Sequence, residues 1–192
     1  MFVGKKVAFY TLGCKLNFSE TSTISRQLTD LGFSKSEFNN GADLFVINTC
    51  SVTENANKEC RRIIRKAKKI SPQSNVIITG CYAQLKPESI SNIEGVDMVV
   101  GANEKFHIPK LLKNFSNKTT EIHGCSINNL NYFSSFSLQD RTRSFLKVQD
   151  GCDYPCTYCT IPLARGKSRS DNIQNIVKNA KEISKNGIKE IV

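Results

Sequence analysis

DLFVINTC, at residues 43–50, is an apolar run that ends in polar residues and a cysteine. The same pattern recurs in NVIITGC at residues 75–81, and a related run, KVAFYT, covers residues 6–11. Short, nearly continuous apolar runs rich in β-branched and aromatic residues are typical of parallel strands that are buried on both faces. We therefore expect three parallel strands, at Lys6–Thr11, Asp43–Thr49 and Asn75–Thr79.

Helical patterns alternate with these runs. Residues Glu54–Ile70 place apolar side chains at spacings of three and four, which indicates one buried helix face. Cys60 lies on that face, so we expect it to pack in the core and not to bind a metal. Strands that alternate with helices predict a doubly wound parallel-sheet α/β domain. Further elements are expected at Ser19–Leu31 (helix), from Pro87 (short helix), at Asp97–Val100 (strand) and at Glu104–Phe115 (helix).

The character of the chain changes after residue 115. Residues 116–142 are rich in Asn and Ser and show no lasting period, which is typical of a linker. A second α/β unit is expected beyond it, with strands at Ser144–Gln149 and Ile188–Val192 around a helix at Asp171–Asn186. The predicted organisation is an N-terminal domain over 1–115, a linker over 116–143 and the start of a second domain over 144–192. Since the sequence stops on a strand, we expect it to be the N-terminal part of a longer protein.

Composition narrows the function classes. Hydrophobic residues make up 39% and charged residues 23% of the 192, as in average globular proteins. No apolar run approaches the ~18 residues that span a bilayer, and the N-terminus does not resemble a secretory signal. We therefore expect a cytoplasmic protein with no membrane partner. The net charge of +10 predicts an anionic partner, and nucleic acid is the leading candidate.

More than half of this net charge lies between residues 58 and 69, within the helix expected at Glu54–Ile70. Seven basic residues stand against Glu59 between residues 58 and 69. Such a run can be merely a solvated face, or it can contact phosphates, since basic clusters attract polyanions. The candidate RNA-binding residues are Arg61, Arg62, Arg65 and Lys69.

Three cysteines are concentrated in GCDYPCTYCT at residues 151–160. Gaps of three and two residues separate Cys152, Cys156 and Cys159. A tight loop of this kind can supply three thiolates to a four-iron four-sulfur cluster and leave the fourth iron open. The alternative is a tetrahedral zinc site, which usually takes four protein ligands, and no fourth ligand stands nearby. Arg165 follows the loop closely enough to reach a bound cofactor or RNA, although a surface arginine would look the same.

Three further cysteines each follow one of the expected strands. Cys14 comes just after the first, Cys50 after the second and Cys81 after the third. The carboxyl ends of neighbouring parallel strands share one edge, where open α/β sheets bind their ligands. The sequence therefore predicts a second three-cysteine cluster site; the alternative is three unrelated buried cysteines.

The segment LKVQDGCDYPCTYCTIPLARGKSRS, at residues 146–170, resembles the radical S-adenosylmethionine motif. This resemblance implies that residues 144–192 begin a TIM-like partial barrel. It also implies that the open iron binds the methionine part of S-adenosylmethionine and that reductive cleavage releases a 5′-deoxyadenosyl radical. Tyr158 matches the position whose aromatic side chain lies near the adenine.

Two cysteine triads in this order, together with TLGCKLNFSETS at residues 11–22, resemble the methylthiotransferase family of radical S-adenosylmethionine enzymes. Its branches modify isopentenyladenosine in tRNA, threonylcarbamoyladenosine in tRNA, or an aspartate of a ribosomal protein. GCKLN at Gly13–Asn17 and ARGKSRS at Ala164–Ser170 favour the threonylcarbamoyladenosine branch. Phe18, Ser19 and Leu163 depart from the branch pattern, which affects fine specificity and not the chemistry.

The resemblance implies an enzyme that adds a methylthio group to N6-threonylcarbamoyladenosine next to the anticodon. It implies two 4Fe-4S clusters and S-adenosyl-L-methionine as cofactors, with tRNA and a reductant such as flavodoxin or ferredoxin as partners. Two alternatives stay open. One is the isopentenyladenosine tRNA enzyme, and the other is a non-catalytic iron–sulfur module that binds RNA or transfers electrons.

Overall fold

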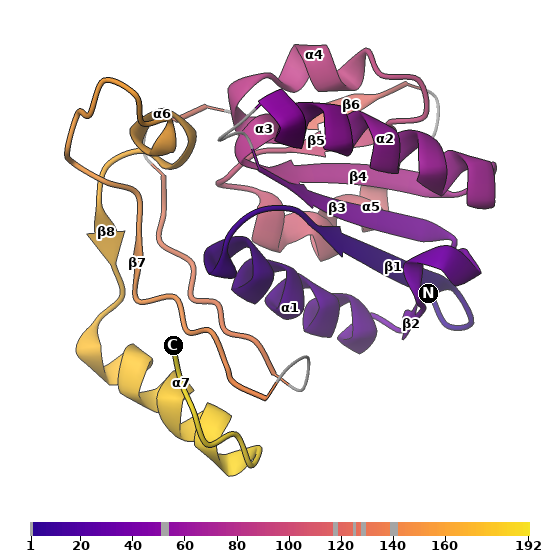
Figure 1. The fold of residues 1–192 in the computed structure, drawn as a ribbon. Coiled ribbons are helices and arrows are strands. Elements are labelled where there is room, and N and C mark those ends of the chain that lie inside the picture. Colours follow the sequence, from indigo (N-terminus) through magenta and orange to yellow (C-terminus); the bar gives the residue numbers. More distant parts are fainter. Residues whose placement is uncertain (1, 51–53, 117–118, 125, 128–129, 139–141) are drawn as a thin grey trace.

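A parallel sheet of six strands forms the centre of the computed structural model, which describes residues 2–50, 54–116, 119–124, 126–127, 130–138 and 142–192 (Figure 1). All five pairings in this sheet are parallel, and the spatial order is β2-β1-β3-β4-β5-β6. The strands are β1 (Lys6–Thr11), β2 (Ser34–Lys35), β3 (Leu44–Thr49), β4 (Asn75–Gly80), β5 (Met98–Val100) and β6 (Glu121–His123). The expected doubly wound α/β fold is confirmed.

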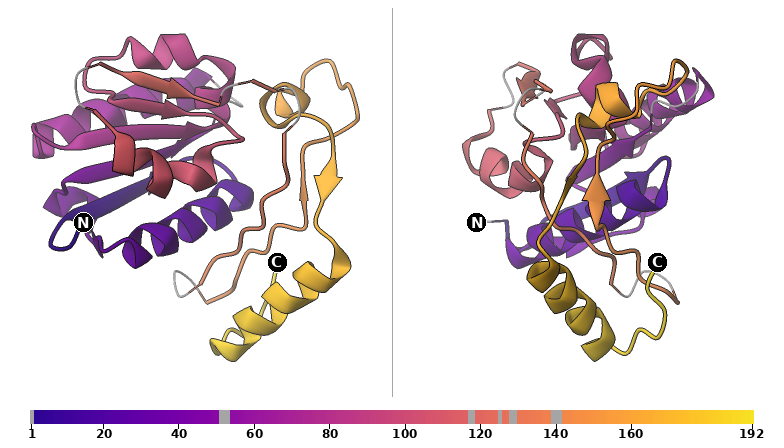
Figure 2. Two further views of the ribbon diagram at one scale, coloured as in Figure 1. Left: turned by 180° about the vertical axis from the view of Figure 1, so that it is seen from behind. Right: turned by 90° about the vertical axis from the view of Figure 1, so that its left-hand side faces the viewer.

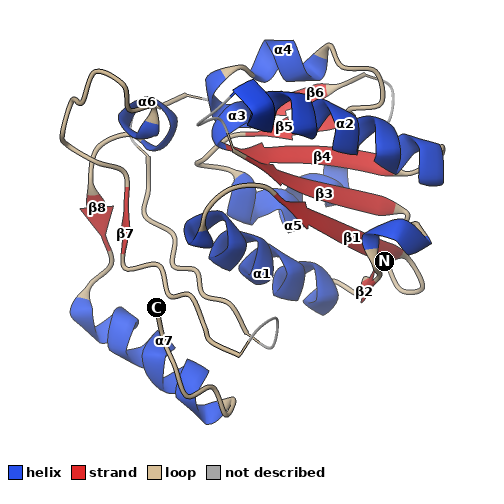
Figure 3. Ribbon diagram, viewed as in Figure 1, coloured by secondary structure: helices blue, strands red, loops and turns tan. Residues whose placement is uncertain are grey.

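Helices cover both faces of this sheet (Figures 1 and 3). One face carries α2 (Glu54–Ile70), α3 (Cys81–Leu85) and α4 (Pro87–Ser91), and the other carries α1 (Lys15–Asp30) and α5 (Ile108–Asn114), which follows the 3-10 turn η2 (Lys105–His107). Successive side chains of a strand point to opposite faces, so Phe45 and Ile47 join the core under α2 while Leu44 and Val46 join the core under α1.

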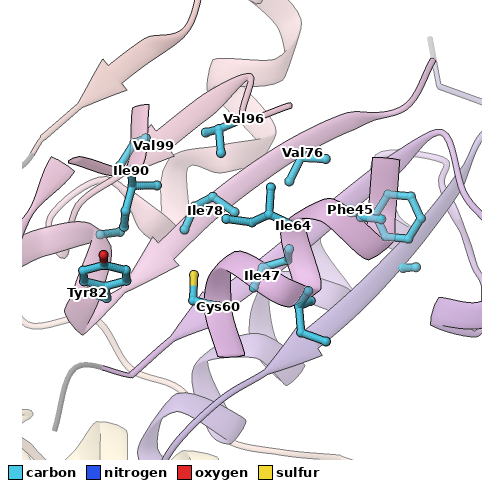
Figure 4. Close-up of a cluster of buried hydrophobic side chains, with 14 of the residues drawn as sticks. Phe45, Ile47, Cys60, Ile64, Val76, Ile78, Tyr82, Ile90, Val96 and Val99 are labelled. Carbon is cyan, nitrogen blue, oxygen red and sulfur yellow. The ribbon is translucent and has the colours of Figure 1, made fainter. Parts of the chain in front are cut away.

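The larger core lies between α2 and the sheet. Figure 4 shows Ile64 of α2 beside Ile47, Val76 and Ile78 of the strands, with Tyr82 and Ile90 at one end. Cys60 is fully buried in this cluster, as its place in the apolar pattern predicted. The helix expected at Glu54–Ile70 has the same bounds in the structure, because its apolar positions form one uninterrupted face.

Several elements differ from the expectation. The first helix begins at Lys15 and not at Ser19, with Cys14 as its N-cap residue. The helix expected at Glu104–Phe115 is the turn η2 followed by the shorter helix α5. The segment expected to be a linker contains β6, which extends the sheet by pairing Val99 with Ile122.

The C-terminal part runs along the side of the sheet to which the strand ends point (Figures 1 and 2). Its β7 (Gln149–Asp150) pairs antiparallel with β8 (Arg169–Ser170), and α6 (Ile161–Arg165) lies between them. Only Gln149 of the strand expected at Ser144–Gln149 lies in β7, and the strand expected at Ile188–Val192 is reduced to one parallel bridge between Ser144 and Ile191. The intervening helix, α7 (Ile173–Lys185), is confirmed. In the part of the chain that the structure describes, no helix is both long and apolar enough to cross a bilayer.

Candidate functional site

The first cysteine triad lies along the carboxyl edge of the sheet. Cys14 caps the start of α1 after β1, Cys50 directly follows β3, and Cys81 is the first residue of α3 after β4. The strand ends are level, because Thr11 pairs with Asn48 and Thr49 pairs with Gly80. The chain order reverses between β1 and β3, and ligands of open α/β sheets bind at such a point. Cys14 and Cys50 flank this position.

The loops that carry these cysteines are in close contact. Gly13 has a φ of +102°, and a Cβ placed on it would lie 2.8 Å from Cβ and 3.1 Å from Sγ of Cys50. Gly80, with a φ of +96°, would bring a Cβ into the backbone of Thr49, with 2.6 Å to its nitrogen. Only glycine permits both the positive φ and the close approach. These two glycines therefore let the cysteine loops pack against each other.

Asn17 ties the loops together through its amide. Its Nδ2 donates to the carbonyl oxygens of Leu12 at 2.9 Å and of Thr49 at 3.1 Å, so it joins the residues preceding Cys14 and Cys50. Its Oδ1 lies 3.9 Å from Sγ of Cys14 and accepts a hydrogen bond of 2.6 Å from Nη2 of Arg165. Asn48 in turn donates to the Asn17 carbonyl oxygen at 3.0 Å.

The donor set suits an iron–sulfur cluster. The described cysteines are all free thiols, and thiolates are the usual ligands of these clusters, while Cys125 lies outside the described residues. Cys14 is exposed and Cys81 is buried; burial raises the pKa of the Cys81 thiol, and the nearby positive charge of Arg165 partly opposes this rise. Among the described residues, no three Cys, His, Asp or Glu side chains already surround one metal position. The thiols thus share one edge without forming a closed centre.

The second triad lies in the loop between β7 and α6. The Cys152 amide donates to the carbonyl oxygen of Gly166 at 3.0 Å, and the Cys159 amide donates to that of Cys156 at 3.0 Å, which folds the loop tightly. Cys156 is exposed and Tyr158 is 89% exposed. A hollow of about 1240 Å³ borders this loop, and it is lined among others by Cys152, Tyr154, Pro162, Lys167 and Arg169.

A cluster of buried charges stands between the two triads. Glu20 of α1 is fully buried and lies 2.7 Å from Nζ of Lys105 and 3.1 Å from Nη1 of Arg165. The same Nη1 donates to Oδ1 of Asp150 at 2.8 Å, and Lys147 lies 3.4 Å from both carboxylates. We call these residues the buried charge network: Glu20, Lys105, Lys147, Asp150 and Arg165.

The network perturbs the protonation of its members. Burial works to raise the pKa of Glu20, but Arg165, Lys105 and Lys147 hold it well below its usual range. Burial lowers the pKa of Lys105, although Glu20 opposes this. Burial also disfavours the charged form of Arg165, but Glu20 and Asp150 outweigh it, so that the pKa of Arg165 lies above its ordinary value.

The structure gives Arg165 a different setting from the one expected. Its residue surface is 4% exposed, and its guanidinium is committed to Glu20, Asp150 and Asn17. A direct contact with RNA would need this network to open. The other members of the network were not identified from the sequence, because their partners come from segments that are far apart in the chain.

The basic face of α2 is exposed beside α4. Arg62 forms an ion pair of 2.6 Å with Glu59, and Lys68 forms one of 2.9 Å with Asp97. Arg61, Arg65 and Lys68 line a groove of about 730 Å³ together with Asn92 of the turn after α4. Lys69 is exposed at the end of the helix. The candidate phosphate-binding side chains therefore share one helix, and Arg61 and Arg65 share one groove.

Comparison with known proteins identifies the family. Residues 6–101, which cover the sheet as far as β5, match the uncharacterized protein family UPF0004. The chain belongs to the UPF0004 family. Cys14, Cys50 and Cys81 all lie within the matched region.

Curated relatives match nearly the whole chain. It is 39% identical over 190 residues to the threonylcarbamoyladenosine tRNA methylthiotransferase MtaB of Bacillus subtilis, and 37% identical over 191 residues to the protein of that name from Aquifex aeolicus. These matches cover 97% of this chain but 42% and 47% of the relatives. The ribosomal protein uS12 methylthiotransferase RimO of Clostridioides difficile is 32% identical over 197 residues, 97% of this chain and 44% of that protein. The chain thus spans less than half the length of the curated relatives that it matches.

Proposed function

We propose that this protein is a radical S-adenosylmethionine tRNA methylthiotransferase that converts N6-threonylcarbamoyladenosine next to the anticodon to its 2-methylthio derivative. The observation that carries the proposal is the pair of cysteine triads, one on the carboxyl edge of the sheet and one in the loop after β7, with Arg165 between them. The relatives named as threonylcarbamoyladenosine enzymes are 36–39% identical, and those named for dimethylallyladenosine or uS12 are 30–32% identical. This order favours the threonylcarbamoyladenosine substrate.

Each triad has a separate task in this proposal. Cys152, Cys156 and Cys159 would hold one 4Fe-4S cluster in an exposed loop, and Cys14, Cys50 and Cys81 would hold another. When bound, these clusters and S-adenosylmethionine would supply radical generation and the sulfur and methyl groups. The chain itself connects the two cysteine triads through the hydrogen bonds of Arg165 to Asn17 and Asp150, and the exposed side chain of Tyr158 would be free to pack against the cofactor.

Iron and sulfide analysis tests the cofactor assignment. Anaerobic reconstitution should give about eight irons and eight sulfides per chain, since each cubic cluster holds four. Changing the cysteines of one triad to alanine should leave about four irons and four sulfides. In the protein as the cell makes it, supplied with a reductant such as flavodoxin, Cys156→Ala should abolish 5′-deoxyadenosine formation. Cys50→Ala should retain it and yield no methylthiolated nucleoside. Zinc in place of iron, or equal loss of cleavage in both variants, would overturn the assignment.

Nucleoside analysis tests the substrate. Cells that lack the gene should accumulate threonylcarbamoyladenosine without its 2-methylthio form, and mass spectrometry of digested tRNA measures both. Loss of the methylthio form of isopentenyladenosine instead would transfer the assignment to that branch. Because tRNA is a cytoplasmic substrate, the proposal also places the protein in the cytoplasm.

The basic face of α2 is the proposed tRNA contact. Changing Arg61, Arg65 and Lys69 to glutamine removes three exposed charges and leaves the apolar stripe of the helix intact. The matched control changes Lys178, Lys181 and Lys185 of α7, which are also exposed. If the α2 residues meet phosphates, tRNA affinity should fall and the slope of its logarithm against log salt should flatten by up to about 0.9 per lost contact. If the α2 variant changes tRNA affinity and salt slope no more than the control does, the basic face of α2 is only solvated.

A further inference from the structure

The buried charge network joins three separate segments of the chain. Glu20 and Asn17 come from α1, Lys105 from η2, and Lys147, Asp150 and Arg165 from the part beyond residue 143. Glu20 and Arg165 are 145 positions apart in the sequence. No other described ion pair that is buried on both sides connects the sheet domain to the C-terminal part; the exposed pair of Arg143 and Glu190 lies within the C-terminal part itself.

Arg165 contacts the surroundings of both triads. On one side it donates to Asn17, which holds the residues before Cys14 and Cys50, and its charge acts on Cys81. On the other side it donates to Asp150, which stands two residues before Cys152. It also belongs to α6, which begins two residues after Cys159, and α6 lies against α3. One guanidinium therefore links the two cysteine loops.

The network also carries an unbalanced positive charge. Three buried cations, Lys105, Lys147 and Arg165, face two buried carboxylates, and the partly buried Arg169 approaches Asp150 to 3.4 Å as well. The rings of Phe106 and Tyr132 lie 5.1 Å and 5.3 Å from Nζ of Lys147, which offsets part of the surplus. A buried charge without a full counter-charge is unfavourable. The acidic group beside the surplus is the Cys81 thiol, which belongs to the first triad.

We propose that Arg165 is a positioning residue that fixes the first cysteine triad relative to the second, and that the anionic cluster expected on the first triad balances the surplus positive charge of the buried network. The proposal rests on the function proposed above. Three thiolates around a doubly charged cubic cluster would sum to one negative charge, which offsets the one-cation surplus of the five buried residues when the partly buried Arg169 is not counted. Loading of the cluster thereby completes the network, and the completed network holds the two loops at a set separation.

The test compares Arg165→Met, Arg165→Lys and Glu20→Gln in the protein as the cell makes it. Arg143→Met is the matched control, since it also breaks an ion pair in the C-terminal part, of 3.2 Å, but one whose side chains are 49% and 58% exposed. Two quantities are measured: the midpoint potential of the first cluster, with Cys152, Cys156 and Cys159 changed to alanine, and the ratio of methylthiolated product to 5′-deoxyadenosine in the protein with both triads.

Opposite shifts are expected from opposite charges. Arg165→Met removes a nearby positive charge, so the first cluster should become harder to reduce and its potential more negative, whereas Glu20→Gln should make it more positive. A merely structural role gives no such reversal of sign. The product ratio should fall steeply in Arg165→Met, by about a hundredfold for each 1 Å of misplacement. Arg165→Lys should restore the potential but not the ratio, because an ammonium cannot reproduce the planar set of donors.

A measurement without cofactors separates this proposal from the proposed function. In the cofactor-free chain, Arg165→Met should speed amide hydrogen exchange in α6 and around Asp150, and Arg143→Met should not. Wild-type protein that takes up no iron would refute the proposed function. The positioning role would be refuted if the wild type takes up iron but Arg165→Met equals Arg143→Met in midpoint potential, product ratio and amide exchange. If Arg165→Met takes up no iron on the first triad, Glu20→Gln decides: a potential equal to the wild type's overturns the charge balance.

Discussion

Gly80→Ala should destabilise the chain far more than the same change at a glycine with open space around its Cβ position. Gly80 has φ +96° and ψ −166°, a backbone region that only glycine occupies readily, and a side chain there costs about 1–3 kcal/mol. Its Cβ would also overlap the carbonyl oxygen and nitrogen of Thr49 and Oδ1 of Asn48, all fixed in β3. Relief of such an overlap costs about 1–3 kcal/mol more. The expected loss is therefore about 4 kcal/mol.

Gly187→Ala is the control, because Gly187 has a φ of +79° but no atom within 4 Å of the added Cβ. It should lose only the conformational part, about 1–2 kcal/mol. Urea unfolding followed by circular dichroism measures both. With a slope of about 2 kcal/mol per molar urea, the midpoint should fall by about 2 M for Gly80→Ala and by less than about 1 M for the control. Equal shifts would show that β3 and β4 separate freely at this edge, and the account of the close approach would be wrong.

Three further predictions concern the cores and the buried charges. Ile64→Ala should lower the free energy of unfolding by about 2–5 kcal/mol because Ile64 is fully buried. Ile173→Ala should lower it by less than about 0.5 kcal/mol because Ile173 is 76% exposed. Urea unfolding measures both, and similar losses would contradict the assigned core. Burial raises the pKa of Cys60 to about 12, so iodoacetamide at pH 8 should label exposed Cys156 quickly and Cys60 only as the chain unfolds, as peptide mass spectrometry can show. The pKa values of Glu20 and Asp150 lie below their usual 4.5 and 3.8, so the stability that these carboxylates supply is present above those values and is lost as the pH falls through the lower folded-state values. Glu20→Gln should therefore flatten the decline of stability below about pH 4.5, and an unchanged decline would mean that Glu20 does not drive it.

The central strands could be predicted because their sequences follow from burial on both faces. β3 is buried at all six positions, so its sequence is a continuous apolar run. β2 and β6 are edge strands of two and three residues, and their sequences, SK and EIH, carry no apolar run. Their pairing is dictated by the neighbouring strand and not by their own composition. The start of α1 was missed because Cys14 is not among the usual N-cap residues.

The candidate site could be predicted from the sequence only in part. A position after a strand places a cysteine at a sheet edge, because the parallel arrangement fixes where all strand ends lie. The partners of Glu20 depend instead on how segments more than a hundred residues apart pack together. Glu20 stands four residues before Ile24 and eight before Leu28, so the local pattern places it on the buried stripe of α1 but does not reveal the cations that pair with it. The burial of Arg165 depends in the same way on residues far away in the sequence.

The spacing of the two triads sets an order of assembly. Cys152, Cys156 and Cys159 stand within eight consecutive positions, so a loop of that size can gather its ligands on its own as soon as it is made. Cys14, Cys50 and Cys81 are brought together only when β1, β3 and β4 have paired across intervals of more than thirty residues, and such long-range pairing is slow. When the complete chain refolds, the later loop is therefore formed first, and the earlier cysteines come together only when the sheet has formed. Pulse labelling with iron should fill the second triad ahead of the first.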